Sequence, residues 1–176
     1  MSDKLELLLN KMHLESTYYD YFKSGELTKI IGNHTKDNYV FFIKINELLP
    51  VDVYTHFVEL LQSLYSDMKV NVSFEVIKVN SDIVCDYYRY FINKYSKSSP
   101  LLGMFLENKV NVLDSIIVTL NNKAEKMKFD SIILRLESDF SSVGINMPVH
   151  TIIDESLENV IQLEIKKDKE KDVVIP

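Results

Sequence analysis

The most regular pattern of apolar residues in the chain covers residues 39–67. Over residues 39–45 apolar side chains alternate, and successive side chains of an extended chain point to opposite sides, so one face of a strand collects Tyr39, Phe41, Ile43 and Ile45. After Pro50 the spacing changes to three and four residues, which gives one helical stripe of Val53, Phe57, Leu60, Leu61 and Leu64. The pattern predicts a strand and a helix over residues 50–66 whose apolar faces fold onto each other.

Two helices are expected before this stretch. Asp3 and Glu6 have the spacing of a capping box, and a stripe at helical spacing follows at Leu5, Leu8, Leu9 and Met12. Ser16 is suited to cap a second helix, which is expected to stop near Gly25 because glycine tolerates the conformation that commonly ends helices. Residues 1–25 are therefore predicted to be helical.

Strands are expected on both sides of the helix at residues 50–66. Residues 27–31 and 39–45 are predicted to form a hairpin through the polar segment between them. Residues 70–76 alternate between apolar and polar side chains, which is typical of a strand that is buried on one face and wet on the other.

In the second half, helices are expected from Ser81 and, after Ser99 and Pro100, through Leu106. Residues 110–120 are interpreted as a single strand. Asn121 or Asn122 is then expected to cap a long helix that ends at Gly144, with a stripe of Phe129, Ile132, Ile133, Leu136 and Phe140.

The C-terminal part is less regular. Residues 149–153 are predicted to be a short strand. Residues 156–165 fit both a helix and a strand, and we favour the helix. Residues 166–172 alternate charges without apolar residues, which is typical of a solvated linker.

Together these elements predict an α+β protein of two small, closely joined units. The first unit covers residues 1–78, the second covers 79–165, and a charged linker or tail covers 166–176. No stretch rich in glycine and proline separates the two units, so they are expected to be attached closely.

Composition narrows the class of protein. Of 176 residues, 46% are hydrophobic, which is enough for a core, and the net charge is -6, so general attraction to a phosphate backbone is not built in. Cys85 is the single cysteine, so an internal disulfide and a cysteine-based zinc cage are excluded. The start of the chain lacks the pattern of a signal peptide, and no apolar run is long enough to span a bilayer. A cytoplasmic protein without membrane contact is expected.

The residues that most often carry catalysis are scattered. No Asp-x-Asp pair occurs to bind catalytic metals, and no histidine has a second His or Cys at i+3 or i+4; the histidines are His13, His34, His56 and His150. Cys85 lies early in a predicted helix without an adjacent histidine, so a small buried core cysteine is favoured over a nucleophile. No catalytic, metal or cofactor residue is assigned, and the segment is expected not to be an enzyme.

Aromatic residues are in surplus on two predicted helices. One contains Tyr18, Tyr19, Tyr21 and Phe22, and the other contains Tyr87, Tyr88, Tyr90, Phe91 and Tyr95. Successive helical residues are about 100° apart, so one buried face cannot hold them all. The interpretation without a functional role is that each ring packs inward with its hydroxyl at the surface. The candidates for a protein interface are Tyr19, Tyr21 and Tyr90, which fit the apolar stripes least well.

The order of elements, together with several short segments, resembles the N-terminal region of the PolC-type DNA polymerase III alpha subunit, a replicative polymerase of bacteria. The resemblance covers essentially residues 1–165, and its weight comes from order and spacing over that length. The segments that carry it are Leu27-Thr28-Lys29-Ile30-Ile31, Tyr39 to Ile45, Asn46-Glu47-Leu48-Leu49-Pro50, Asp86-Tyr87-Tyr88, Ser99-Pro100-Leu101-Leu102 and the end of the long helix near Phe140 and Gly144.

The resemblance implies a fold and a partner. By this resemblance the first unit is similar to the C-terminal, polymerase-binding domain of the clamp-loader tau subunit, and the second unit is KH-like. The region would be a non-catalytic interaction module of the replisome, a monomer in isolation, whose partners are tau and the remaining domains of the polymerase chain.

An alternative is that the KH-like unit binds single-stranded nucleic acid and helps to handle template or primer. Such units use a Gly-x-x-Gly loop to approach phosphates, and no pair of the four glycines has that spacing. The basic cluster Lys123, Lys126 and Lys128 is interrupted by Glu125 and followed by Asp130, which is more typical of a solvated helix face.

Overall fold

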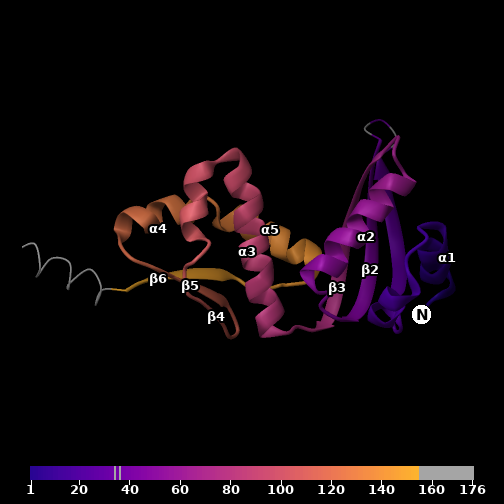
Figure 1. The fold of residues 1–176 in the computed structure, drawn as a ribbon, viewed down its shortest axis with the longest axis horizontal. Coiled ribbons are helices and arrows are strands. Elements are labelled where there is room, and N and C mark those ends of the chain that lie inside the picture. Colours follow the sequence, from indigo (N-terminus) through magenta and orange to yellow (C-terminus); the bar gives the residue numbers. More distant parts are fainter. Residues whose placement is uncertain (34, 36, 155–176) are drawn as a thin grey trace, which may run out of the picture.

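The computed structural model describes residues 1–33, 35 and 37–154, and it contains two three-stranded sheets with helices packed against them (Figure 1). The first half consists of α1 (Asp3–Lys11), the 3-10 helix η1 (Ser16–Phe22), β1 (Glu26–Asn33), β2 (Asn38–Glu47), α2 (Val51–Leu64) and β3 (Lys69–Lys78). The second half consists of α3 (Ser81–Ser98), the 3-10 helix η2 (Pro100–Phe105), β4 (Val110–Val112), β5 (Ile116–Leu120), α4 (Lys123–Asp130), α5 (Ile133–Val143) and β6 (Val149–Ile153). The α+β class predicted from the sequence is confirmed.

The two sheets have the same topology. Their strand orders are β1-β2-β3 and β4-β5-β6, and in each sheet the first two strands are antiparallel while the last two are parallel. Each sheet is preceded by a helix and a 3-10 helix, and helical structure connects its second strand to its third. The halves lie next to each other along the long axis of the molecule, with α3 and α5 between the two sheets (Figure 1).

The strand and helix predicted at residues 39–66 form the centre of the first half. Phe41, Ile43 and Ile45 of β2 are buried, as the alternating pattern predicts. The ring of Phe57, on α2, stacks on Phe22 at a centroid distance of 5.3 Å and meets Phe74 of β3 at 5.6 Å. The apolar stripe of α2 therefore closes the core over the sheet, as predicted, except at Leu64, which is exposed at the end of the helix.

Several helix starts lie one residue from the predicted position. Ser2, not Asp3, caps α1: its Oγ accepts from the Leu5 N–H at 3.3 Å. Asn80, not Ser81, caps α3, and Pro50 flanks α2, which begins at Val51. A capping side chain belongs to a residue with extended backbone just before the helix, and Ser2 and Asn80 have that conformation. The cap predicted for the helix after residue 121 is confirmed at Asn122, whose Oδ1 accepts from the Glu125 N–H.

The segment predicted as a second α-helix is the 3-10 helix η1. Ser16 does not cap it, because the flanking residue is Glu15 and no side chain bonds to its first N–H groups. Within η1 the buried residue is Phe22, so core packing holds the segment at its end instead of along an α-helical stripe.

Two elements predicted in the second half are interrupted. The single strand expected at residues 110–120 is a hairpin of β4 and β5, because Leu113 to Ser115 form a tight turn closed by the Leu113 N–H and the Ser115 carbonyl at 3.0 Å. The long helix expected after Asn122 is divided into α4 and α5 at Ile132, whose φ of -109° and ψ of -3° leave the helical range. The break lets Phe129 and Phe140 enter the core from differently directed helices.

The two halves are joined by packing as well as by the chain. Gly144 ends α5 with a φ of +101°, and an added Cβ there would lie 2.2 Å from Val76 Cγ2 and 3.3 Å from the Phe74 carbonyl oxygen, both on β3. The Tyr87 hydroxyl donates to the Leu49 carbonyl at 2.7 Å, and the Tyr54 ring contacts the rings of both Phe74 and Tyr87. The close attachment expected from the sequence is therefore present.

Two predictions concern residues outside the described part: the helix at residues 156–165 and the charged linker at 166–176. In the part of the chain that the structure describes, no helix is both long and apolar enough to cross a membrane.

The contact at Gly144 predicts a large effect for Gly144→Ala. A left-handed conformation costs about 1–3 kcal/mol for a residue with a Cβ, and the overlap with Val76 costs a similar amount, so the free energy of unfolding should fall by about 2–6 kcal/mol. Urea unfolding followed by circular dichroism measures this change.

The matched control is Gly103→Ala in η2. An added Cβ there meets its nearest atom, Ser96 Cβ, at 3.7 Å, so stability should change by less than about 0.5 kcal/mol. Equal effects of the two substitutions would show that the contact between α5 and β3 does not constrain the fold.

Candidate protein-interaction groove

An open groove of about 360 Å³ lies between α1 and β1, at the end of the molecule far from the second sheet (Figure 1). Its walls come from α1, β1, β2 and the residue after α2: Lys4, Leu7, Leu8, Lys11, Leu27, Thr28, Lys29, Ile30, Phe41 and Tyr65. Leu8 and Phe41 are buried, and the Phe41 ring lies 5.6 Å from that of Tyr65. We call this feature the α1–β1 groove.

Hydrogen bonds hold α1 against β1. The Ser2 Oγ that caps α1 also accepts from the Leu27 N–H at 3.3 Å, and the Ser2 N–H donates to the Gly25 carbonyl at 2.9 Å. A Cβ at Gly25 would lie 2.7 Å from Leu5 Cδ2, so glycine permits this close approach. The wall formed by α1 is therefore fixed at its N-terminal end.

Apolar side chains on the rim of the α1–β1 groove are exposed. Leu7 is 57% exposed and Ile30 is 49% exposed. On α1 the groove residues Lys4, Leu7, Leu8 and Lys11 recur at i, i+3, i+4 and i+7, so they share one face. A large exposed apolar rim beside positive charge is a feature of surfaces that bind other proteins.

The two edges of the first sheet differ in their surroundings. The β3 edge meets the end of α5 at Gly144. The outer side of β1 pairs with no strand in the described residues, and seven of its eight residues are exposed. An uncovered strand presents N–H and C=O groups that can pair with another chain.

The tyrosines predicted from the sequence as interface residues lie outside this groove. Tyr19 is half-buried, and its hydroxyl donates to Asn10 Oδ1 at 2.9 Å, which ties η1 to a different face of α1. Tyr21 is exposed on η1. Tyr90 is on α3 and lines a separate hollow with Pro50 and Val51 where the two halves meet. The structure keeps Tyr19 and Tyr21 on one segment and places Tyr90 elsewhere, and the interface role of all three stays a prediction.

Most of the remaining aromatic surplus is core. Tyr87 and Tyr88 are fully buried, and their hydroxyls donate to the carbonyls of Leu49 and Phe105 at 2.7 and 2.8 Å. Burial raises the pKa of both phenols far above the ordinary value, and it raises the pKa of Tyr54 to about 12. The interpretation that rings point inward is right for Tyr87 and Tyr88, but their hydroxyls find buried carbonyls instead of the surface.

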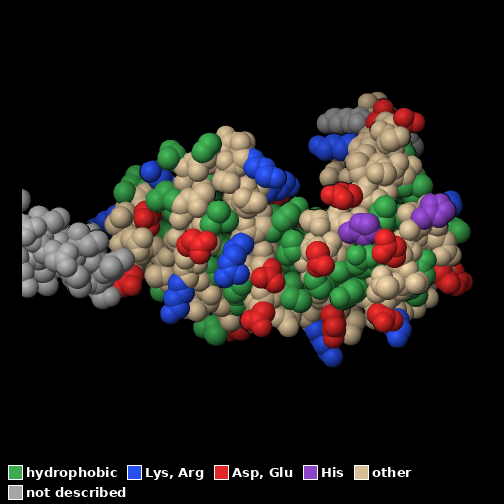
Figure 2. Space-filling model, in the orientation of Figure 1, with side chains coloured by type: hydrophobic (Ala, Val, Ile, Leu, Met, Phe, Trp, Pro, Cys, Tyr) green, Lys and Arg blue, Asp and Glu red, His purple; other side chains and the backbone are tan. Residues whose placement is uncertain are grey.

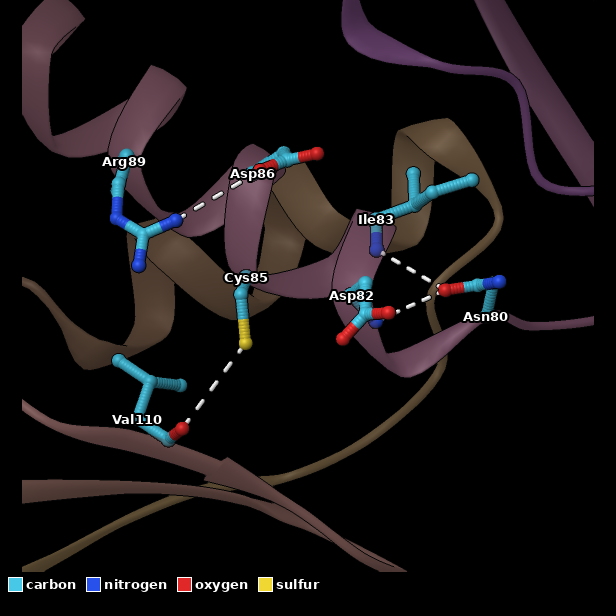
Figure 3. A network of polar contacts seen from close by, with 7 residues as sticks. All are labelled: Asn80, Asp82, Ile83, Cys85, Asp86, Arg89 and Val110. Atoms are coloured by element: carbon cyan, nitrogen blue, oxygen red, sulfur yellow. Dashed lines mark hydrogen bonds and ion pairs between the residues drawn. The ribbon is translucent and has the colours of Figure 1, made fainter.

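Cys85 is half-buried, so the prediction of a buried core cysteine is wrong (Figure 3). Its thiol points toward β4 and donates to the Val110 carbonyl at 3.9 Å, while Asp86 pairs with Arg89 on the outer side of α3 at 3.6 Å. The edge position of Cys85 follows from its place beside the stripe of α3 instead of on it. Burial raises the pKa of the Cys85 thiol; Arg89 opposes this, and Asp82 adds to it.

Titratable groups form no obvious reaction centre in residues 1–33, 35 and 37–154. Within these residues no group of three or more His, Cys, Asp or Glu side chains is placed to hold a metal ion. On the face seen in Figure 2 acidic and basic side chains are interspersed over both halves. In the basic cluster on α4, the Lys126 ammonium pairs with the Asp130 carboxylate at 2.8 Å, which offsets part of the positive charge of the cluster.

One sequence signal could have located the α1–β1 groove. Leu7 lies off the buried stripe of α1 but shares a face with Lys4 and Lys11, and Ile30 and Ile31 are adjacent apolar residues in an edge strand. Apolar residues that a helix stripe or a strand face cannot bury are candidates for an interface. The sequence argument followed the aromatic residues and missed these aliphatic ones.

The fold and the groove define an α+β protein of two closely packed units with an exposed apolar groove. Comparison with known proteins then gives one matching family model: residues 4–76 match the family described as DNA polymerase III polC-type N-terminus I. The resemblance to the N-terminal region of PolC-type DNA polymerase III found in the sequence is therefore confirmed.

Curated relatives extend the similarity beyond residue 76. The chain is 25% identical over 154 residues to DNA polymerase III PolC-type of Bacillus subtilis, a match that covers 85% of this chain. It is 20% identical over 146 residues to the Latilactobacillus sakei protein of the same name, covering 79%, and 25% identical over 165 residues to a Streptococcus thermophilus one, covering 93%. The chain spans about 10% of the length of these relatives. No solved structure matches the chain.

The environment of Cys85 predicts slow alkylation. A raised thiol pKa leaves less thiolate at pH 7.5, and thiolate is the reacting form, so iodoacetamide should modify the folded chain at least about threefold more slowly than the chain unfolded in urea. The midpoint of the pH profile should move above the ordinary thiol value. Mass spectrometry of timed samples measures both, and equal rates in the folded and unfolded chains would contradict the described environment of Cys85.

Proposed function

We propose that this chain is a non-catalytic interaction module at the N-terminus of a PolC-type replicative DNA polymerase, and that it contacts the clamp-loader tau subunit to tether the polymerase in the replisome. The observation that carries the proposal is the α1–β1 groove, an exposed apolar surface beside an open strand edge. The remaining domains of the polymerase chain are a second expected contact. Bacterial DNA replication is the process in which the module acts.

The family supports the place of the module in replication. The relatives are named DNA polymerase III PolC-type, and the family model is described as an N-terminal part of that protein. The groove lies within residues 4–76, the part that matches the family model. The surface and the family match therefore coincide on the first unit.

The fold of each unit belongs to the same proposal. The first unit, with its helices, hairpin, helix and parallel strand, is compatible with a fold like that of the tau C-terminal domain. In the second unit β5, α4, α5 and β6 form a strand, helix, helix, strand order with the two strands parallel, which supports a KH-like fold. The turn between α4 and α5 has Ser131 and Ile132 where a nucleic-acid-binding loop would need glycines, so the protein partner is the stronger proposal.

Calorimetric titration of the chain with the tau subunit of the same organism tests the proposal. We expect measurable binding at tens of micromolar, and Leu7→Asp should weaken it at least about tenfold because a charge would stand on the apolar rim. Leu134→Asp is the matched control: Leu134 is 82% exposed on α5, far from the groove, so binding should be unchanged.

Two outcomes would contradict the proposal in different ways. No heat at these concentrations would exclude tau as a direct partner. Binding that both substitutions leave unchanged, with the circular dichroism of each variant intact, would place the tau contact outside the α1–β1 groove.

A further inference from the structure

We propose that the partner of the α1–β1 groove is an extended peptide segment, with a short run of apolar side chains between acidic ones, that adds to the outer edge of β1 as a fourth strand. The proposal rests on the proposed function in that the module binds a protein. It goes further by stating the conformation and the chemistry of the bound segment.

Exposure on both faces of β1 favours an added strand over a helix. Ile30 lies opposite Phe41 in the register and faces the groove, whereas Ile31 lies opposite Val40 and faces the other side of the sheet. Ile30 is 49% exposed and Ile31 is 52% exposed. A helix in the groove would cover Ile30 alone. A strand paired with β1 has side chains on both faces and covers both residues.

The other sheet edges are less suitable as templates. The end of α5 at Gly144 occupies the β3 edge near Phe74 and Val76. In the second sheet the outer strands β4 and β6 have three and five residues, whereas β1 has eight. Short edge strands are a common protection against strand pairing. A long open edge with uncharged residues from Ile30 to Asn33 lacks that protection over half of its length.

The start of β1 limits where the added strand can lie. The Leu27 N–H is on the outer side and is occupied by Ser2 Oγ, and the register with β2 shifts between Leu27 and Lys29. The edge available for pairing therefore runs from Lys29 to Asn33. Within it, the side chain of Ile30 points into the groove. A partner strand of about five residues fits this length.

Charge selects an acidic segment. Lys4 and Lys11 lie on the groove face of α1, about 10 Å apart along the helix. Residues four apart in a strand share a face and lie about 13 Å apart, a span that two long lysine side chains can reach. Lys29 lies on the opposite face of the sheet, 4.7 Å from the centre of the Phe42 ring. Glu6 of α1 lies off the groove face by helix spacing, whereas Asp3, four residues before Leu7, borders that face at the start of the helix. Glu26 lies opposite Lys44. Lysines therefore flank both faces of the open edge in a chain of net charge -6.

Selection from a library of random twelve-residue peptides displayed on phage tests the segment directly, without assuming tau. We expect enriched peptides in which aspartate or glutamate lies on both sides of a run of two or three apolar residues. Bound to the chain, a synthetic copy of such a peptide should slow hydrogen exchange of the backbone amides from Lys29 to Asn33, because those at the outer edge would gain partners.

Charge reversal gives the second readout. Lys4→Glu with Lys11→Glu should weaken the selected peptide about tenfold, since two ion pairs are lost and repulsion replaces them. Lys94→Glu with Lys97→Glu, two exposed lysines on α3, is the matched control and should leave binding unchanged. Circular dichroism checks that both double variants fold.

The outcomes separate this inference from the proposed function. Peptides that repeat apolar residues every three or four positions, basic peptides, or no enrichment would overturn the added strand. Unchanged exchange over β1 in the presence of a bound peptide would also overturn it. If the chain binds tau but gives one of these results, its proposed function stands and the added strand is refuted. If it selects acidic strand peptides but does not bind tau, the added strand on β1 is supported and tau is refuted as the partner.

Discussion

The close contact between the end of α5 and strand β3 is the constraint on which the arrangement of the molecule depends. Gly144 brings its backbone against Val76 and Phe74, a distance that a Cβ would not permit. This contact occupies the β3 edge near Phe74 and Val76, whereas the opposite edge of the first sheet, at β1, pairs with no strand in the described residues. The contact between the halves thus favours β1 over β3 as the edge available for binding.

The joint is also where polar and apolar packing reinforce each other. Tyr54 contributes its ring to both core clusters, and Tyr87 spans the boundary by donating to the Leu49 carbonyl. A buried carbonyl without a partner costs about 1–3 kcal/mol, so this hydrogen bond favours one relative position of the halves. The sequence segment from Asn46 to Pro50, which carries part of the family resemblance, contains the acceptor. Its residues lie at the boundary between the two halves.

Elements with a strong apolar period could be predicted from the sequence, and elements shaped by tertiary packing could not. The strand β2 and the helix α2 follow from spacing alone, because each buries one face of regular structure. The break at Ile132 has no glycine or proline to mark it and depends on where Phe129 and Phe140 must enter the core. The turn at Asp114 was hidden for a similar reason, since apolar residues flank it on both sides.

The groove escaped sequence reasoning because its apolar residues are few and belong to three separate elements. Ile30 and Phe41 are partners in the β1–β2 hairpin, and Leu7 joins them only when α1 packs along β1, which uses the hydroxyl of Ser2 and the small size of Gly25. Aromatic surplus was the wrong guide to this surface, since buried carbonyls satisfy Tyr87 and Tyr88 inside the fold. Residues that neither a helix stripe nor a sheet face can bury are a better guide, because their exposure persists after the core is complete.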